Sequence, residues 1–367
     1  MKHEPGLASW LQLTLTPGLG ATTLRAMLRQ FGLPQSILQD KRSQLAAHLP
    51  PQVLSALDSA PVRAAVERAL EWASVPGQAV VTLADDAYPR ALLEIPDPPA
   101  LLYACGRIEL LRRPALAVVG SRNASAQGER NAETFARALS DAGLTIVSGL
   151  ALGIDAGAHR GGLAGASATI AVLGTGIDVL YPQRNAALAA DIAARGLLVS
   201  EFPLGTPPAA PNFPRRNRLI SGLAQGCLVV EAALASGSLI TARAAAEQGR
   251  EVFAIPGSIH SPLSKGCHAL IKSGAKLVES ADDVLAELGG FRPSASASTA
   301  QPMPARAADT GVLGHMGHDP VDVDSLCTRA GMSAEQVSSE LLRLELDGRV
   351  ASLPGGLYQR LEKGERR

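Results

Sequence analysis

The stretch "LAVVGS", residues 116–121, decides the fold that we predict for this chain. It is a continuous apolar run that ends in a glycine turn, and such runs are typical of parallel strands buried on both faces. Stretches of helix length separate this run from others like it, so we predict an α/β fold with a doubly wound parallel sheet. The further runs are "LTIVSG" (144–149), "TIAVLG" (169–174), "LLVSE" (197–201), "CLVVEA" (227–232), "EVFAIPG" (251–257) and "AKLVE" (275–279).

The turn after the first strand has the composition of a phosphate contact. In "VVGSRNAS", Gly120 lets a ligand approach the backbone, Ser121 can donate a hydrogen bond, and Arg122 can bind a phosphate with two parallel hydrogen bonds. Ligands of doubly wound sheets bind at the carboxyl ends of the strands, where this turn lies. Taken alone, the turn is equally well explained as a strand-to-helix connection that carries a surface arginine.

The next strand ends in a second such turn, "SGLALGIDAGAH". Ser148 and Gly149 begin a loop that enters a helix, so its amides can face an anion, and we include both among the candidate nucleic-acid contacts. Asp155 and His159 are four residues apart and share a helical face. They could form an acid/base pair, but we favour Asp155 as a helix cap and His159 as a hydrogen-bonding partner.

A third turn lies in "ASGSLITARAAAEQG". It places Ser236, Gly237 and Ser238 at another passage from strand to helix, and Glu231 comes just before it. Three such turns on one edge of one sheet predict a phosphate-binding site there.

The stretch "FPRRNRLISGL", residues 213–223, gathers positive charge and contains no acid. An aromatic ring beside arginines is how proteins hold a single strand without reading its sequence, because bases stack on the ring and guanidinium groups follow the phosphates. The alternative is a surface helix in which Phe213 is a hydrophobic staple. The neighbouring glycine turns favour nucleic acid. The candidate contacts are Phe213, Arg215, Arg216, Asn217 and Arg218.

The segments around the sheet predict two smaller domains. Residues 1–75 are predicted to be helical, and "LQLTLTPGLGATTLRAMLRQFG" resembles a helix-hairpin-helix or sterile-alpha-motif-like unit. We favour a small bundle packed on the main domain, residues 80–288, over a second DNA contact. Residues 289–309 are rich in Pro, Ala and Ser and predict a flexible linker.

The region 310–362 predicts a winged-helix domain. One helix should end at Gly331, a second should start after Ser333, and a hairpin should turn at Pro354-Gly355-Gly356. From residue 310 onward there are nine acids and seven bases, so a packing, dimer or partner surface is favoured over duplex DNA. The apolar side of the second helix is predicted to include Val337, Leu341, Leu342, Leu344 and Leu346.

The composition narrows the class of protein. Lys plus Arg (34) equals Asp plus Glu (34), which argues against a basic coat but allows a local basic groove. The four cysteines form no CxxC pair, and no signal peptide or membrane span is predicted, so we expect a cytoplasmic protein with free thiols. No zinc, Walker or two-metal pattern and no oriented nucleophile is present, so we predict no metal, no cofactor, no catalytic residue and no enzyme.

Taken together, these motifs resemble the DNA-processing protein A (DprA/Smf) family of bacterial natural transformation. The resemblance covers roughly residues 85–280. It implies an extended Rossmann-like core that binds single-stranded DNA as a homodimer, and transfer of that DNA to the RecA recombinase past single-strand-binding protein. The matching stretches are "YPRALLEIPDPPALLYACG", "VVGSR", "SGLALGIDAGAH", "VLGTGIDVLYPQRN", "SEFPLG", "FPRRNRLISGL", "VVEAALASGSLITA", "GREVFAIPGS" and "KGCHALIKSGA".

The resemblance also implies roles for particular residues. Residues 120–122 would hold a backbone phosphate, Phe213 would contact a base, and residues 216–218 and 236–238 would line the same pocket. Many relatives have a lysine where this chain has Gln183, and Arg184 follows it.

A second hypothesis is an enzyme or sensor for a nucleotide-like ligand, because the core also resembles that of phosphoribohydrolases. Their PGGxGTxxE loop is replaced here by Ser-Gly-Ser. Under that hypothesis Glu231 is the acid to test.

Overall fold

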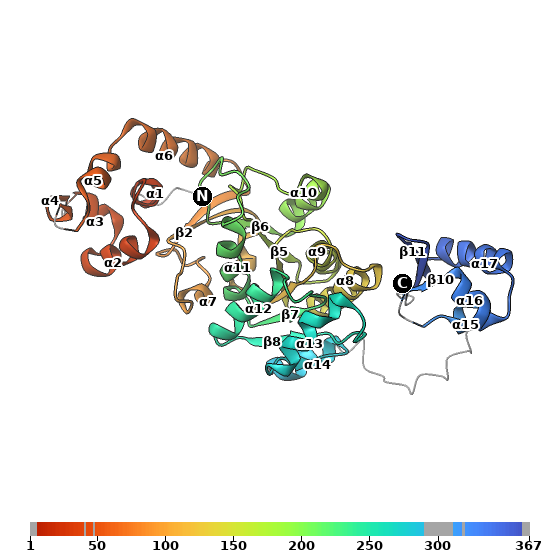
Figure 1. Cartoon of the computed structure of the whole chain (residues 1–367). Helices are drawn as coiled ribbons and strands as arrows, with labels where there is room; N and C mark the ends of the chain where they lie inside the picture. Colours follow the sequence, from red (N-terminus) through yellow and green to blue (C-terminus); the bar gives the residue numbers. More distant parts are fainter. Residues whose placement is uncertain (1–5, 40–41, 47, 290–310, 318–319, 362–367) are drawn as a thin grey trace.

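The computed structural model describes residues 6–39, 42–46, 48–289, 311–317 and 320–361. A large sheet with helices on both faces forms the centre of the molecule (Figure 1). A bundle of N-terminal helices lies against one side of it, and a small C-terminal unit lies beside helix α8 (Ala126–Asp141).

The central sheet has nine strands in the order β1-β2-β6-β5-β4-β3-β7-β8-β9. All seven predicted strands are present, and the strands from β6 to β9 in this order pair in parallel. The predicted α/β class is therefore confirmed. The strands are β1 (Gln78–Thr82), β2 (Leu101–Gly106), β3 (Ala115–Val119), β4 (Thr145–Ser148), β5 (Thr169–Val172), β6 (Leu197–Ser200), β7 (Gly226–Val229), β8 (Glu251–Ala254) and β9 (Lys276–Leu277).

Strand β3, the first of the predicted apolar runs, shows why these runs are apolar on both faces. In β3, Leu116 and Val118 belong to one buried cluster, whereas Ala117 and Val119 belong to the cluster on the opposite face. Helices α8, α9 and α14 pack in the first cluster, and α7, α11, α12 and α13 pack in the second. These helices, with α10, are α7 (Arg90–Leu93), α8, α9 (Ile154–Ala164), α10 (Ala186–Arg195), α11 (Asn212–Gly222), α12 (Ser238–Glu247), α13 (Lys265–Lys272) and α14 (Ala281–Leu288).

The parallel sheet is extended by a feature that the sequence did not reveal. Strands β1 and β2 pair with each other in antiparallel fashion, and β2 pairs in the same way with β6. The predicted parallel sheet therefore continues at this edge into two antiparallel strands. The two strands are joined through the proline-rich segment 89–99 and the short helix α7, not through the long helical crossover that a parallel connection needs.

The N-terminal helices form a bundle that packs on the main domain, as favoured from the sequence. Their core includes Trp10, Leu24 and Met27, and it also contains Ala100 from the main domain. Arg25 of α2 forms an ion pair with Asp97, so this arginine is held against the main domain. The helices are α1 (Leu7–Leu15), α2 (Ala21–Phe31), α3 (Pro34–Gln39), α4 (Arg42–Leu45), α5 (Pro51–Leu57) and α6 (Ala60–Ala73).

The C-terminal unit has the predicted order of helix, turn, helix and hairpin. Gly331 ends α16 in the left-handed conformation, and Ser333 caps α17. The predicted apolar side of α17 was wrong in part, because Leu342 and Leu346 are exposed and only Val337, Leu341 and Leu344 are buried. The elements are α15 (Val312–His315), β10 (Val321–Asp322), α16 (Val323–Ala330), α17 (Ala334–Leu346), β11 (Val350–Leu353) and β12 (Leu357–Arg360).

The C-terminal unit touches the main domain at α8, where Arg130 donates a hydrogen bond to the carbonyl of Gly348 at 3.3 Å. The predicted linker lies almost entirely outside the described residues. The division of the chain at residues 75, 80, 288, 309 and 362 stays a prediction.

Candidate nucleic-acid interface

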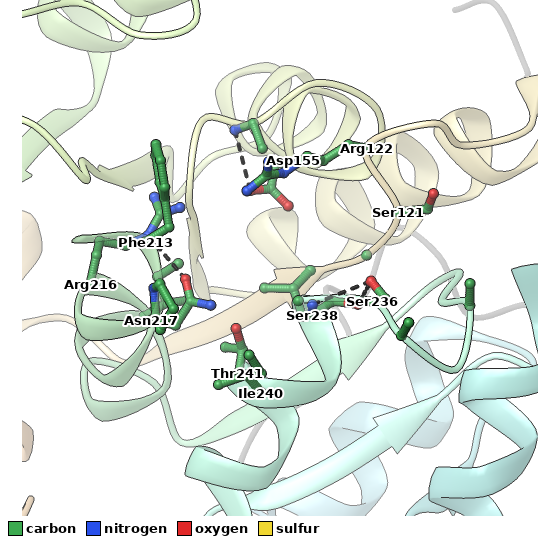
Figure 2. Close-up of a pocket in the computed structure, with 18 of the residues that line it drawn as sticks. Ser121, Arg122, Asp155, Phe213, Arg216, Asn217, Ser236, Ser238, Ile240 and Thr241 are labelled. Carbon is green, nitrogen blue, oxygen red and sulfur yellow. Dashed lines mark hydrogen bonds between the residues drawn. The ribbon is translucent and has the colours of Figure 1, made fainter. Parts of the chain in front are cut away.

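An open cleft of about 800 Å³ lies where the parallel strands end. Three of the segments that form its walls were predicted: the turn between β3 and α8, the first turns of α11, and the turn between β7 and α12 (Figure 2). The structure thus brings together segments that lie more than one hundred residues apart. Of the thirteen predicted contacts, those in the lining are Gly120, Ser121, Arg122, Phe213, Arg216, Asn217, Ser236, Gly237 and Ser238.

The turn between β3 and α8 is held by a hydrogen bond to the segment that follows β7, the neighbouring strand in the sheet. Arg122 in this turn stays exposed. The amide of Ser121 donates to the carbonyl of Glu231 at 2.7 Å. A Cβ at Gly120 would lie 2.8 Å from that same carbonyl oxygen, so glycine permits the close approach. Arg122 is exposed, and within the described residues no hydrogen bond or ion pair engages its guanidinium group. It is therefore the cation in this cleft that can meet an anion directly.

Glu231 supports this turn from below. Its carboxylate accepts hydrogen bonds from the Ser125 amide at 2.9 Å and the Ser125 hydroxyl at 2.6 Å. Ser125 in turn caps α8 by accepting from the amide of Gly128. Burial raises the pKa of Glu231, and the two bonds from Ser125 oppose that shift. The carboxylate therefore positions the phosphate turn, with both oxygens already engaged.

The loop between β4 and α9 is held by Asp155 and His159. Asp155 accepts from the amides of Gly149 and Ala151, at 3.1 and 3.3 Å, rather than from the helix it was predicted to cap. His159 accepts from the amide of Leu150 at 3.2 Å, so its hydrogen-bonding role is confirmed. Burial raises the pKa of Asp155 and lowers that of His159 to about 3. Neither side chain is set up as an acid/base pair.

Two predicted contacts in this loop lie beneath the cleft. The Ser148 hydroxyl is fully buried and donates to the carbonyl of Val118 at 2.7 Å. Gly149 lines a small adjoining cavity of about 70 Å³, and its carbonyl accepts from Arg216 at 2.6 Å. Whether either residue meets a ligand stays a prediction, and both shape the floor beneath the β4–α9 loop.

Arg216 is the most buried of the three clustered arginines, with 4% of its surface exposed. It donates to the carbonyls of Gly149 and Val172, which come from two neighbouring strand ends. Its Nε donates to Asn217 at 3.1 Å. Burial lowers the pKa of Arg216 to about 10, and nearby Asp155 opposes this shift. This arginine ties helix α11 to the strand ends.

Arg215 and Arg218 lie outside the cleft lining and pair with acids that lie outside the basic stretch. Glu201, only 3% exposed at its side chain, forms ion pairs with both arginines. Arg218 also pairs with Asp97 at 3.4 Å, and Arg215 lies over the ring of Phe202 at 5.3 Å. Burial raises the pKa of Glu201, and both arginines oppose that shift. The basic stretch is therefore largely neutralised in space.

Aromatic rings meet the exposed arginine on one side of the cleft. The Arg122 guanidinium lies 5.5 Å from the centroid of the Phe213 ring, which is a cation–π contact. Tyr181 also lines the cleft, with its ring centroid 5.7 Å from that of Phe213 and the two planes tilted by 41°. Our sequence analysis missed Tyr181, although it follows a glycine-containing turn at the end of β5.

The turn between β7 and α12 forms the opposite wall. The hydroxyls of Ser236 and Ser238 are 2.7 Å apart (Figure 2). Exposed Gly237 is the N-cap of α12. The N-termini of α8, α9 and α12 all follow strand ends at this edge of the sheet. Each helix N-terminus carries a partial positive charge, so this edge attracts anions.

Gln183, at the position where many relatives have a lysine, and Arg184 are exposed but do not line the cleft. The Gln183 side-chain amide donates a hydrogen bond to the carbonyl of Leu180 at 3.2 Å.

Within the described residues, no group of His, Cys, Asp or Glu side chains could hold a metal ion. No helix in the described part of the chain is both long and apolar enough to cross a membrane.

Comparison with known proteins gives a consistent match. The family described as DNA recombination-mediator protein A matches residues 79–289, and a DprA winged helix domain matches residues 296–356. Protein Smf of Escherichia coli is 44% identical over 314 residues, which cover 82% of each chain. The DNA processing protein DprA of Streptococcus pneumoniae is 52% identical over 206 residues, covering 56% of this chain and 73% of the other.

Solved structures agree with these matches. The crystal structure of DNA processing protein A from Streptococcus pneumoniae superposes with a TM-score of 0.68 and 40% identity, covering 76% of this chain and 97% of the other. The structure of DNA processing protein A from Helicobacter pylori, which addresses single-stranded DNA binding by that protein, has a TM-score of 0.52 and 30% identity. It covers 57% of this chain and 95% of the other.

Proposed function

The chain belongs to the DNA recombination-mediator protein A family, and from that premise we propose that it binds single-stranded DNA in the cleft at the strand ends. The relative from Helicobacter pylori is described as binding single-stranded DNA. We further propose that this chain acts as a homodimer and transfers the strand to the RecA recombinase, past single-strand-binding protein.

One observation carries the proposal: an exposed guanidinium, with no hydrogen bond or ion pair in the described residues, and two aromatic rings face the same cleft. Arg122 and the N-terminus of α12 supply positive charge for phosphates. Phe213 and Tyr181 form a contacting aromatic pair that gives bases a surface on which to stack. Because every base has a π face, stacking of this kind gives little sequence preference.

The shape of the cleft favours a single strand over a duplex. The rings lie in a concave pocket between α11 and two strand-to-helix turns. The bases of a duplex are stacked on one another, so they cannot reach the rings without unpairing. We therefore expect weak duplex binding at this site.

The geometry gives less support to the nucleotide-processing hypothesis. Both carboxylate oxygens of Glu231 accept hydrogen bonds from Ser125, and the carboxylate of Asp155 accepts from loop amides. These acids hold loops in place, and neither carboxylate is positioned to activate a water molecule. Release of a base from a nucleoside monophosphate, lost in Glu231→Gln, would instead favour the enzyme.

The direct test is fluorescence anisotropy with a labelled poly-dT oligonucleotide and a matched duplex at low and moderate salt. Arg122→Ala should weaken single-strand binding about tenfold. The slope of the logarithm of the binding constant against the logarithm of the salt concentration should become less negative by about 0.7, because one phosphate contact is lost. Arg113→Ala is the matched control. Both arginines are exposed and flank strand β3, but Arg113 precedes the strand, at the end away from the cleft, whereas Arg122 follows the strand.

The outcome separates the hypotheses. The cleft is supported as the binding site if the parent binds single strands tightly, Arg122→Ala weakens that binding, and Arg113→Ala does not. A folded parent protein that binds no single strand contradicts the proposal. The handover to RecA is tested separately, by strand exchange on DNA covered with single-strand-binding protein.

A further inference from the structure

We propose that Tyr181 is the principal surface on which a base stacks, and that Phe213 is the ring that supports it. This inference rests on the proposed single-strand binding and names a binding residue for it. Tyr181 is 44% exposed, and it is the only aromatic residue among the exposed large hydrophobic side chains in the described part of the chain.

The ring of Phe213 is already in contact on several sides. The Arg122 guanidinium lies over it at 5.5 Å. At its edge, a Cβ added to Gly174 would come within 2.8 Å of Phe213 Cδ1, so the ring packs against the backbone there. A base that stacked on Phe213 would have to displace Arg122, whereas the exposed part of the Tyr181 ring needs no rearrangement.

The two rings contact each other directly and do not form a slot. Their planes are tilted by 41°. Their centroids are 5.7 Å apart, and this distance is within the usual range for two aromatic rings in direct contact. No base fits between them at that separation. The surface left for a base is therefore the exposed side of Tyr181, backed by Phe213.

The loop that carries Tyr181 is held on both sides. The Thr175 hydroxyl donates to the carbonyl of Val179 at 2.6 Å. After the ring, buried Asn185 donates to the carbonyls of Leu150 and Ala151 at 2.9 and 3.1 Å. Because the loop is already fixed, stacking on Tyr181 requires little further loss of conformational entropy.

The experiment combines two changes in a thermodynamic cycle. Parent protein, Tyr181→Ala and Tyr181→Phe are titrated with a labelled dT oligonucleotide and with an abasic oligomer of the same length and charge. Tyr181→Ala should bind dT roughly tenfold more weakly, within the range found for one base–aromatic stack. Its salt dependence should equal that of the parent, because no charge is removed.

Two further results are expected from the cycle. Tyr181→Phe keeps the ring and should bind dT as the parent does. On the abasic oligomer, Tyr181→Ala and the parent should bind alike, because there is no base to stack. Because Tyr181 is 44% exposed, each variant should keep the fold of the parent, and thermal unfolding of each variant checks this point.

Other outcomes overturn the inference and remain distinct from failure of the proposed function. If the parent binds dT and Arg122→Ala weakens it, but Tyr181→Ala binds as the parent does, Tyr181 is not the stacking surface. The same conclusion holds if Tyr181→Ala weakens binding of the abasic oligomer equally. If the parent binds no single strand, the proposed function itself fails.

Discussion

Arg122 and Arg216 both line the cleft, but they belong to different layers of the molecule. Arg122 lies with Tyr181 and Gly237 in an exposed rim, where within the described residues its guanidinium has no hydrogen bond or ion pair and contacts the face of the Phe213 ring. Arg216 lies with Asp155 and His159 in a buried layer beneath, where it is bound to two backbone carbonyls. The difference teaches that charge in a binding sequence can serve the ligand or the loops that surround it.

The comparison gives distinct expectations for the two layers. Changes in the exposed rim should alter DNA binding and leave stability unchanged, as tested above with Arg122 and Tyr181. Changes in the buried layer should alter stability first. A variant of the buried layer that lost only DNA binding would break the distinction.

The largest effect is expected for Arg216→Ala. The change removes hydrogen bonds from the carbonyls of Gly149 and Val172 and leaves buried Asp155 without its nearby cation. Removal of one partner from a buried charged network typically costs about 3 kcal/mol or more. Urea unfolding followed by circular dichroism measures the loss, and Arg113→Ala is the control, expected to unfold as the parent does.

A smaller effect is expected from the pH dependence of stability. The folded state keeps His159 neutral down to about pH 3, whereas the unfolded chain takes up a proton near pH 6.5. The free energy of unfolding should therefore fall as the pH drops below 6.5, by about 2 kcal/mol between pH 8 and pH 5 from this residue. His159→Gln should lack this part of the slope.

The measurement is urea unfolding of the parent and His159→Gln at several pH values. The other described histidines and the buried acids are common to both proteins, so their contributions cancel in the difference between the two curves. Parallel curves for parent and variant would show that His159 becomes protonated in the folded protein.

The smallest effect is expected for Arg215→Ala. This side chain is 53% exposed, pairs with Glu201 outside the cleft, and leaves Arg218 paired with the same acid. The loss of stability should stay below about 1 kcal/mol, because water screens the exposed arginine and buried Glu201 keeps its ion pair with Arg218. Single-strand affinity and its salt dependence should stay within about twofold of the parent. An affinity loss as large as that of Arg122→Ala would indicate that the DNA strand binds along the outer side of α11, and not in the cleft.

Much of the fold could be predicted because the signal is local. The apolar runs of the parallel strands and their glycine turns are each read within about ten residues, and the order of the runs places all three turns at one edge. The antiparallel strands β1 and β2 lacked such a signal, because neither is followed by a long helix that marks a parallel crossover.

The division of the site into layers could not be read from the sequence. "FPRRNRLISGL" contains no acid, yet Glu201 at the end of β6 pairs with Arg215 and Arg218. Asp97, 121 residues before Arg218, also pairs with that arginine. Burial of Arg216 depends on carbonyls from two strand ends. Tyr181 could have been found only by asking which aromatic residue follows a strand end near Phe213.

Hydrogen–deuterium exchange with and without a poly-dT oligonucleotide tests most directly that the strand lies in the cleft. We predict slower exchange in the loops 120–125, 177–185 and 234–240, which surround the cleft at the strand ends. Exchange in residues 321–360 should be unchanged by DNA. Protection centred on residues 321–360 or on the N-terminal helices, with none in the three loops, would contradict this account.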